Sequence, residues 1–342
     1  MQETSAQRYS RQELFAPIGA AGQARLTNAR VAIVGVGALG TVSAGQLARA
    51  GVGFLRCIDR DVVDWTNLQR QVLFDERDAE AGVAKATAAA VQLRHFNSRI
   101  QVEPVTADLT SANIQTLLGD VDLIVDATDN AQVRQLLNDF AVSRSIPWIY
   151  GAAVSSYGVT CLIRPGVTPC LTCLFGEGDP GSHDTCDTVG VIAAVTGIIA
   201  SAQVAEALKF LTGNTAALRD GLLYVDVWQN EWRSLPFGDR RVDCPTCGLR
   251  QFPLLEARAN SFTVTFCGRQ TIQVRPQADT TVNLPHLTTR LRPLGTVRAN
   301  DSLLRFDVDG IQMSLFADGR ALIHGVTDPA AARSFYARYV GM

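Results

Sequence analysis

The stretch VAIVGVGALG, residues Val31 to Gly40, decides the fold of this chain. A short run rich in β-branched residues meets three glycines and passes into TVSAGQLARAG, whose apolar spacing is helical. Gly35, Gly37 and Gly40 form a G-x-G-x-x-G pattern at the junction of strand and helix. Such glycines permit a tight turn and a close approach of the backbone to phosphate, and the helix N-terminus attracts the anion. The stretch therefore predicts a nucleotide-binding loop.

An acidic residue and further strands extend this unit. Asp59 ends the strand FLRCID about 20 residues beyond the glycine loop, where it would accept hydrogen bonds from ribose hydroxyls. Strands that alternate with helices predict right-handed crossovers and a mostly parallel, Rossmann-like sheet. The predicted strands are residues 101–105, 121–128 and 146–154, and the predicted helices are residues 84–94, 112–118 and 131–143.

The regular alternation of strands and helices stops after Gly151. VTCLIRP, from Val159, and LLYVDVW, residues 222–228, predict antiparallel strands that extend the sheet, so the fold class is α/β. From residue 250 onward, short strands followed by one helix predict a small α+β domain. We therefore expect two domains, residues 1–249 and residues 250–342.

The composition is that of a globular protein. Hydrophobic residues make up 47% and charged residues 19% of the 342 residues, and the net charge of −2 argues against a broad nucleic-acid surface. The N-terminus has no apolar run that would serve as a secretory signal. The most apolar window, residues 189–202, is shorter than the roughly 20 residues that a bilayer requires, and predicts a buried helix. We expect a cytoplasmic protein with neither nucleic acid nor membrane as a partner.

A polar and cationic cluster follows Asp59. Asn67, Arg70 and Gln71, in VDWTNLQRQ, stand just beyond the second strand. Arg70 offers a planar fork for phosphate oxygens, and Lys85, on the next helix, offers a second, point-like cation. Only two of the 31 basic residues are lysines, which favours a specific role for Lys85 over an ordinary solvated lysine. A nicotinamide-dependent dehydrogenase would not need this cluster, so we disfavour that function.

Two carboxylates, Asp126 and Asp129, stand in VDATDN at the end of a predicted parallel strand. Doubly wound sheets place their ligand sites at this edge. A carboxylate there would hold Mg²⁺ against a triphosphate. The alternative is that Asp129 caps the helix that starts at Asn130.

Eight cysteines in a chain without a secretory signal need a metal, a reaction or burial to explain them. Two C-x-x-C pairs, CLTC and CPTC, stand about 70 residues apart. Together they predict one closed, structural zinc site. Its ligands would be Cys170, Cys173, Cys244 and Cys247.

The other four cysteines differ in their surroundings. Cys186, in DTCDTVG, stands where a glycine-rich loop meets the apolar helix. A helix N-terminus stabilises a thiolate, so Cys186 is a candidate nucleophile or sulfur acceptor, with a buried, inert cysteine as the alternative. Cys57 and Cys161 lie in apolar strands and are predicted to be core residues. Cys267, in FCGRQ, receives no assignment.

These motifs together resemble the E1-like ThiF/MoeB/HesA adenylyltransferase family over about residues 8–248, and most of all its long bacterial ThiF-type members. The agreement is carried, in chain order, by RYSRQELF, GVGALG, DRDVVDWTNLQRQ, the helix lysine, DATDN, the paired C-x-x-C motifs and TCDTVGV. The resemblance implies binding of ATP and Mg²⁺. It also implies attack by the C-terminal glycine carboxylate of a ubiquitin-like sulfur carrier protein on the α-phosphate. The products would be a carrier acyl-adenylate and pyrophosphate, and sulfur transfer would then give a thiocarboxylate.

The resemblance assigns roles at the nucleotide site, residue by residue. The three glycines would form the nucleotide loop, and Asp59 would hold the ribose. The phosphates would be contacted by Asn67, Arg70 and Lys85. Asp129 would bind Mg²⁺ or position the triphosphate.

Further implied roles concern partners. Arg11, in RYSRQ, would act as an arginine finger in the site of a neighbouring subunit, which implies a homodimer. Cys186 aligns with a loop cysteine that in ThiF-like relatives can link covalently to the carrier. Residues 250–342 do not resemble a rhodanese domain, and we expect them to dock the carrier or support the dimer. The alternative is that Cys267 replaces the rhodanese persulfide cysteine.

The expected carrier is ThiS-like, ends in Gly-Gly and serves the thiazole of thiamine. The alternative is a MoaD-like carrier for molybdopterin, because carrier choice depends on surface contacts. A cysteine desulfurase or another donor would supply the sulfur. A catalytically silent scaffold held by zinc would not need Arg11, Lys85 and Asp129 together.

Overall fold

The computed structural model describes residues 8–176, 189–256, 263–265, 271–274, 282–300 and 303–341. The chain divides into two compact units, Met1–Arg258 and Ala259–Met342, which are described separately. The sequence predicted a boundary after residue 249. The structure instead places the short helix α12 (Pro253–Glu256) in the larger unit, so the division comes nine residues later.

The larger unit is built on one eight-stranded sheet with the order β3-β2-β1-β4-β5-β6-β7-β8. Strands β3, β2, β1, β4 and β5 are parallel, and β6, β7 and β8 continue the sheet antiparallel. The predicted α/β fold, a Rossmann-like sheet extended by antiparallel strands, is confirmed. The strands are β1 (Arg30–Val34), β2 (Phe54–Ile58), β3 (Gln101–Val105), β4 (Leu123–Asp126), β5 (Trp148–Val154), β6 (Tyr157–Ile163), β7 (Gly221–Asp226) and β8 (Glu231–Pro236).

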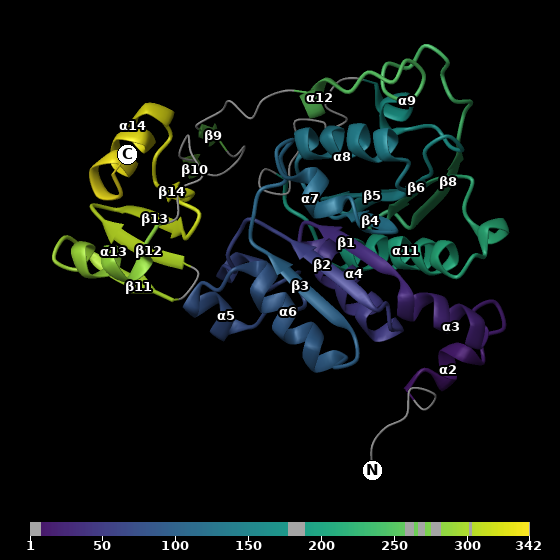
Figure 1. Cartoon of the computed structure of the whole chain (residues 1–342), viewed down its shortest axis with the longest axis horizontal. Helices are drawn as coiled ribbons and strands as arrows, with labels where there is room; N and C mark the ends of the chain where they lie inside the picture. The colour runs from purple at the N-terminus through teal and green to yellow at the C-terminus, as the bar shows by residue number, and fades with distance from the viewer. Residues whose placement is uncertain are drawn as a thin grey trace. The chain divides into compact units, whose positions relative to one another are not determined.

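Helices cover both faces of the parallel part, as Figure 1 shows. Alternate residues of β1 enter two cores: Val31 and Ile33 pack with α4 and α6, whereas Ala32 and Val34 pack with α7 and α8. Burial on both faces explains why β1 reads as a continuous apolar run. The helices of this unit are α2 (Ser10–Glu13), α3 (Gly19–Asn28), α4 (Ala38–Ala50), η1 (Trp65–Asn67), α5 (Glu76–Ala81), α6 (Lys85–Phe96), α7 (Ile114–Leu118), α8 (Ala131–Arg144), α9 (Leu171–Phe175), α11 (Ala193–Leu211), η2 (Thr215–Ala217) and α12.

Residues 193–202 of the apolar window that was predicted to be a buried helix form the first half of α11, whereas residues 189–192 precede this helix and are mostly exposed. In the part of the chain that the structure describes, α11 is the one helix long and apolar enough to cross a membrane. It packs against α4, β5 and β6, and its Gln203 is fully buried. The amide of Gln203 donates a hydrogen bond to the Asp126 carbonyl oxygen at 2.7 Å, so α11 is part of the core.

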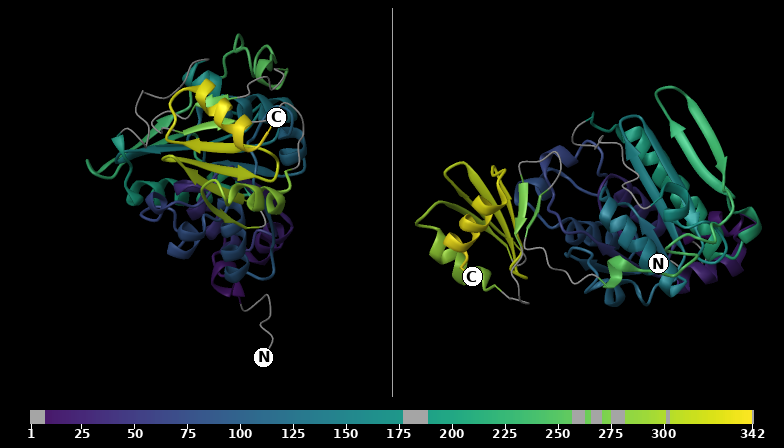
Figure 2. Two further views of the ribbon diagram at one scale, coloured as in Figure 1. Left: turned by 90° about the vertical axis from the view of Figure 1, so that its left-hand side faces the viewer. Right: turned by 90° about the horizontal axis from the view of Figure 1, so that it is seen from above.

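The smaller unit holds a six-stranded sheet with the order β11-β12-β13-β14-β10-β9, in which all pairings are antiparallel. Helices α13 (Leu284–Leu291) and α14 (Pro329–Tyr339) share one apolar core with this sheet. The predicted small α+β domain is confirmed, but α13 lies between β10 and β11, where the sequence predicted strands followed by a single helix. The sheet and helices of this domain are drawn in light green and yellow in Figure 2. Its strands are β9 (Thr263–Thr265), β10 (Thr271–Val274), β11 (Thr296–Ala299), β12 (Leu303–Val308), β13 (Ile311–Phe316) and β14 (Ala321–His324).

Candidate active site and four-cysteine cluster

The predicted nucleotide loop lies between β1 and α4. Gly35 has φ = +88°, and a Cβ there would lie 2.7 Å from the Ala127 carbonyl oxygen. A Cβ on Gly40 would lie 2.0 Å from the Gly35 carbonyl oxygen, so backbone packing requires both glycines. A Cβ on Gly37, by contrast, would meet only the side-chain nitrogen of Gln71, at 3.9 Å. The open side of the loop is therefore at Gly37, the N-cap of α4.

Asp59 fastens this loop to the end of β2. Its two carboxylate oxygens accept the backbone N–H groups of Val36 and Asp61, each at 2.7 Å. Burial raises the pKa of Asp59 above its ordinary value, while the Lys85 ammonium and these two N–H donors oppose the rise. The carboxylate keeps free lone pairs, so holding a ribose stays compatible with its position.

Lys85 begins α6 and is buried at the same end of the sheet. Its ammonium Nζ lies 3.3 Å from Asp61 Oδ2, and its backbone N–H donates to the Asp61 carbonyl oxygen at 2.9 Å. The other lysine, Lys209 on α11, is more exposed and pairs with Glu206 at 2.6 Å. The structure therefore places Lys85, and not Lys209, beside Asp59 and the nucleotide loop.

Asn67 ends η1, Arg70 and Gln71 follow it, and the three side chains have different surroundings. Asn67 is buried, and its Oδ1 accepts the backbone N–H of Asp64 at 3.0 Å, which closes a capping box and shapes the loop. Arg70 is half-exposed and donates to the Thr66 carbonyl oxygen at 2.9 Å. Gln71 is buried beside Gly37, and its Oε1 finds no hydrogen-bond partner among the described residues. Gln71 is therefore a neighbour of the nucleotide loop that sequence reasoning noted but did not assign.

The loop after β4 is held by a buried ion pair. Asp126 accepts the N–H and the hydroxyl of Thr128 at 2.9 and 2.7 Å, and Nε of Arg134 at 3.2 Å. Arg134 also donates to the carbonyl oxygens of Thr128 and Gly151. Arg134 was not predicted to belong to the site, because its position in the predicted helix is that of an ordinary polar surface residue.

Asp129 lies at the exposed tip of this loop, at the carboxyl edge of the sheet. The capping alternative for Asp129 is wrong, because Asn130 is the N-cap of α8 and accepts the Val133 N–H at 3.0 Å. Arg60, also missed, directly follows Asp59 and pairs with Asp108 at 3.0 Å.

Arg11 lies on α2, far from the glycine loop of its own chain. The flanking residues anchor α2 at the C-terminal end of α4: Tyr9 OH accepts from Asn97 at 2.8 Å, and Gln12 donates to the Ala50 carbonyl oxygen at 2.9 Å. Helix α4 has 13 residues, and at 1.5 Å per residue its ends are about 20 Å apart. The exposed Arg11 side chain therefore does not reach the N-terminus of α4 within one chain.

The four predicted zinc ligands lie together. Sulfur–sulfur distances are 3.9 Å for Cys170 and Cys173, 3.7 Å for Cys170 and Cys244, and 3.4 Å for Cys173 and Cys247. All four sulfur atoms lie within 4.8 Å of one another. Sulfur atoms around a tetrahedral zinc ion are about 3.8 Å apart, given Zn–S bonds of about 2.3 Å. The donor set therefore fits Zn²⁺ in number, chemistry and spacing.

The remaining cysteines divide into two groups. Cys57 and Cys161 are buried core residues as predicted, and burial raises the pKa of each thiol to about 12. Cys186 and Cys267 lie outside the described residues.

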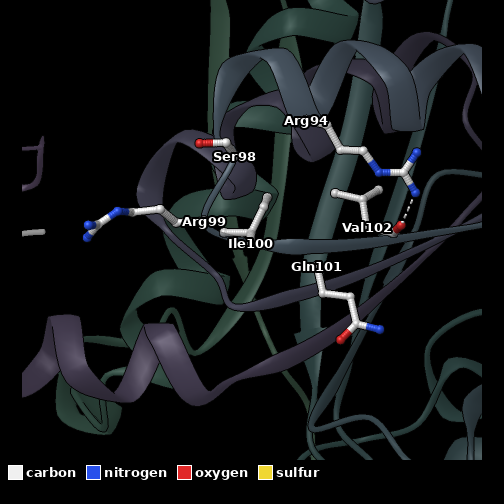
Figure 3. Close-up of a pocket in the computed structure, with 6 residues that line it drawn as sticks. All are labelled: Arg94, Ser98, Arg99, Ile100, Gln101 and Val102. Carbon is white, nitrogen blue, oxygen red and sulfur yellow. Dashed lines mark hydrogen bonds between the residues drawn. The ribbon is translucent and has the colours of Figure 1, made fainter. Parts of the chain in front are cut away.

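One open cavity of about 630 Å³ lies away from these residues (Figure 3). It is lined by the end of α6 and the start of β3, and Arg94 on its wall donates to the Val102 carbonyl oxygen at 2.6 Å. The candidate site lies at the other end of the strands, where Asp59 N–H donates to the Val105 carbonyl oxygen. The cavity therefore belongs to the opposite edge of the sheet.

A parallel α/β sheet with a glycine loop, an acidic end of β2 and cations at its carboxyl edge defines a Rossmann-type nucleotide-binding protein. The chain belongs to the ThiF family, whose profile matches residues 9–246.

The chain is 45% identical over 336 residues to the "Sulfur carrier protein ThiS adenylyltransferase" of Bacillus subtilis, covering 98% of this chain and 99% of that protein. It is 39% identical over 241 residues to the "Adenylyltransferase and sulfurtransferase MOCS3" of Culex quinquefasciatus, covering 70% of this chain and 55% of that protein. Among solved structures, E. coli MccB crystallised with ATP has a TM-score of 0.61 and 26% identity, covering 70% of this chain and 74% of that one.

Proposed function

We propose that this protein is an ATP-dependent adenylyltransferase acting on the C-terminal glycine of a ThiS-like sulfur carrier protein in thiamine thiazole synthesis. One observation carries the proposal. Gly37, Lys85 and Asp129 belong to the connections that follow three neighbouring strands, β1, β2 and β4, whose carboxyl ends are aligned because Val34 pairs with both Ile58 and Asp126. A phosphate loop, a cation and a carboxylate at this edge suit a nucleoside triphosphate.

The reaction uses these residues for binding and electrostatics. The N-terminus of α4 would receive the phosphates at Gly37, and Asp59 would hold the ribose. Lys85 and Arg70 would offset the repulsion between the carrier carboxylate and the α-phosphate. The carboxylate oxygen forms a bond to the α-phosphorus while the bond to pyrophosphate breaks, which gives the acyl-adenylate. Asp129 would hold Mg²⁺, which suits oxygen ligands and would neutralise triphosphate charge.

The position of Arg11 supports a homodimer. Its anchoring at the far end of α4 excludes action in its own site but leaves the exposed side chain able to enter a partner's site. In this arrangement the arginine would stabilise charge on the transferred phosphoryl group. We propose that Zn²⁺ at the four cysteines is structural, because four thiolates leave no open coordination position.

Two carriers are candidate substrates. The match over nearly the whole length of the Bacillus protein favours a ThiS-like carrier, and the match to MOCS3 keeps a MoaD-like carrier for molybdopterin as the second candidate. The sulfur would come from a cysteine desulfurase or another donor in the cytoplasm. Cys186 would form a covalent link to the carrier during sulfur transfer and would not be needed for adenylation.

The test is exchange of labelled pyrophosphate into ATP, measured side by side with a ThiS-like and a MoaD-like carrier. We expect exchange that depends on the ThiS-like carrier. Exchange with the MoaD-like carrier alone would select the second candidate. Exchange with neither carrier would refute the proposed adenylyltransferase activity.

Single variants separate the proposed roles. Asp129→Ala should abolish exchange, whereas Cys186→Ala should leave it intact and impair sulfur transfer only. Asp239→Ala, which removes an exposed carboxylate of the same unit, is the matched control. Equal losses in the Asp129 and Cys186 variants would contradict this division of roles.

A further inference from the structure

Two polar residues of α8 are buried against the four-cysteine cluster. Asn138 is fully buried, and both ends of its amide are used. Its Oδ1 accepts the Leu171 N–H at 2.9 Å, and its Nδ2 donates to Thr172 Oγ1 at 3.0 Å. Leu171 and Thr172 are the two residues between the cysteines of the first knuckle, CLTC. Asn138 therefore fixes the backbone and the side chain of that knuckle.

The two knuckles also contact each other directly. Thr172 and Thr246 occupy the same position in CLTC and CPTC, and their hydroxyl oxygens lie 3.0 Å apart. Thr246 donates to Asp139 Oδ1 at 3.5 Å, and Asp139 Oδ2 accepts the Leu254 N–H at 3.3 Å. A buried polar chain therefore runs from α8 through both knuckles and back to α8, and reaches α12.

We propose that Asn138, Asp139, Thr172 and Thr246 are positioning residues of the zinc site, which hold the two knuckles at the spacing of a tetrahedral ion. The ligands come from segments 74 residues apart, and this chain of hydrogen bonds joins the two knuckles directly, in addition to the metal. Polar groups beyond the ligands commonly orient a metal site, and their loss weakens metal binding. The inference concerns the metal site alone and is independent of the proposed adenylation.

The same helix also holds the candidate active site. Arg134, which binds the loop that carries Asp129, stands one helical turn before Asn138 on α8. Both α9 and α12 pack against this helix (Figure 1). Successive turns of α8 therefore anchor the Asp129 loop and the two cysteine knuckles.

The experiment measures zinc affinity of the full-length protein by competition with a chromogenic chelator. Thr172→Val and Thr246→Val keep the side-chain volume and remove the hydroxyl, and each should weaken zinc binding roughly 10- to 100-fold. The double variant should lose less zinc-binding free energy than the two single variants lose together, because the two hydroxyls contact each other. The control is Thr160→Val, which removes a buried hydroxyl donating to the Tyr150 carbonyl oxygen at 2.8 Å in β6. It should leave zinc affinity unchanged.

Serine variants make the result decisive. Thr172→Ser and Thr246→Ser keep the hydroxyl, so both should bind zinc nearly as tightly as the native protein. Zinc affinity within twofold of native in the valine variants would overturn the proposal. So would failure of serine to preserve affinity where valine loses it, since the hydroxyl would then not be the cause.

Discussion

Replacing Arg134 by methionine tests the buried ion pair that supports the loop after β4. Asp126 is fully buried, and the Arg134 side chain is 12% exposed. The substitution removes the contact between Nε and Asp126 Oδ2 at 3.2 Å and leaves the carbonyl oxygens of Thr128 and Gly151 without this donor. Breaking one partner of a buried pair costs about 3–5 kcal/mol in the free energy of unfolding. The thermal midpoint should fall by roughly 6–20 °C.

The defect should also depend on pH. Burial raises the pKa of Asp126 above its ordinary value, while the Arg134 charge and the Thr128 hydrogen bonds oppose this rise. Without Arg134 the folded-state pKa rises further, so the native state binds a proton that the unfolded chain releases near pH 4. Stability should therefore be lost progressively as the pH rises above about 4, and the defect should be larger at pH 7 than at pH 5.

Urea unfolding at several pH values measures both effects. Arg233→Met is the matched control, because Arg233 and Glu231 form a pair that is 60% and 41% exposed. Such a pair is worth about 0–1 kcal/mol. Asp126→Asn in the Arg134→Met background should recover part of the stability, since no buried charge remains. Equal losses for the Arg134 and Arg233 variants, or a loss that does not change with pH, would refute the reasoning.

Two further predictions concern the nucleotide loop and the buried lysine. Gly40→Ala forces a Cβ to 2.0 Å from a backbone oxygen and should destabilise the larger unit by about 1–3 kcal/mol or more. The Cβ of Gly37→Ala enters open space, so this variant should keep the unfolding midpoint and weaken ATP binding roughly 10- to 100-fold by calorimetry. A stability loss in Gly37→Ala and none in Gly40→Ala would contradict the geometry. Lys85→Met should lower pyrophosphate exchange roughly 10- to 100-fold, because a charge-assisted contact to phosphate is lost. Lys209→Arg should not change exchange, and equal activity of the two variants would remove Lys85 from the site.

The sheet was predictable because its signals are local. Short β-branched runs, glycines at fixed offsets and helical spacing mark β1, α4 and β2 between residues 30 and 58, and the C-x-x-C spacing marks the four clustered cysteines. Asn67 shows that one local pattern is compatible with two roles. Its side chain was expected to contact the phosphates, and in the structure it closes a capping box with Asp64. The spacing of Asp64 and Asn67 was the available signal for that second role.

The buried polar residues of α8 were not predictable in this way. Arg134, Asn138 and Asp139 stand in AQVRQLLNDF, where they read as the solvated face of a helix. Segments distant in sequence bury them, namely the end of β4, the middle of β5 at Gly151 and the two cysteine knuckles. Arg11 is a further case, because the structure of one chain places it away from the glycine loop of that chain.

The scarcity of lysine bears on the survival of an activated intermediate. A carrier acyl-adenylate is a mixed anhydride that any neutral amine nearby would attack, which would attach the carrier to the enzyme by an unproductive amide. Arginine stays protonated at neutral pH and is a poor nucleophile. Two of the 31 basic residues are lysines, and the ammonium groups of Lys85 and Lys209 are held by Asp61 and Glu206. Almost all of the positive charge of the protein is carried by guanidinium groups. The activated carrier therefore meets few amines that it could acylate before sulfur transfer.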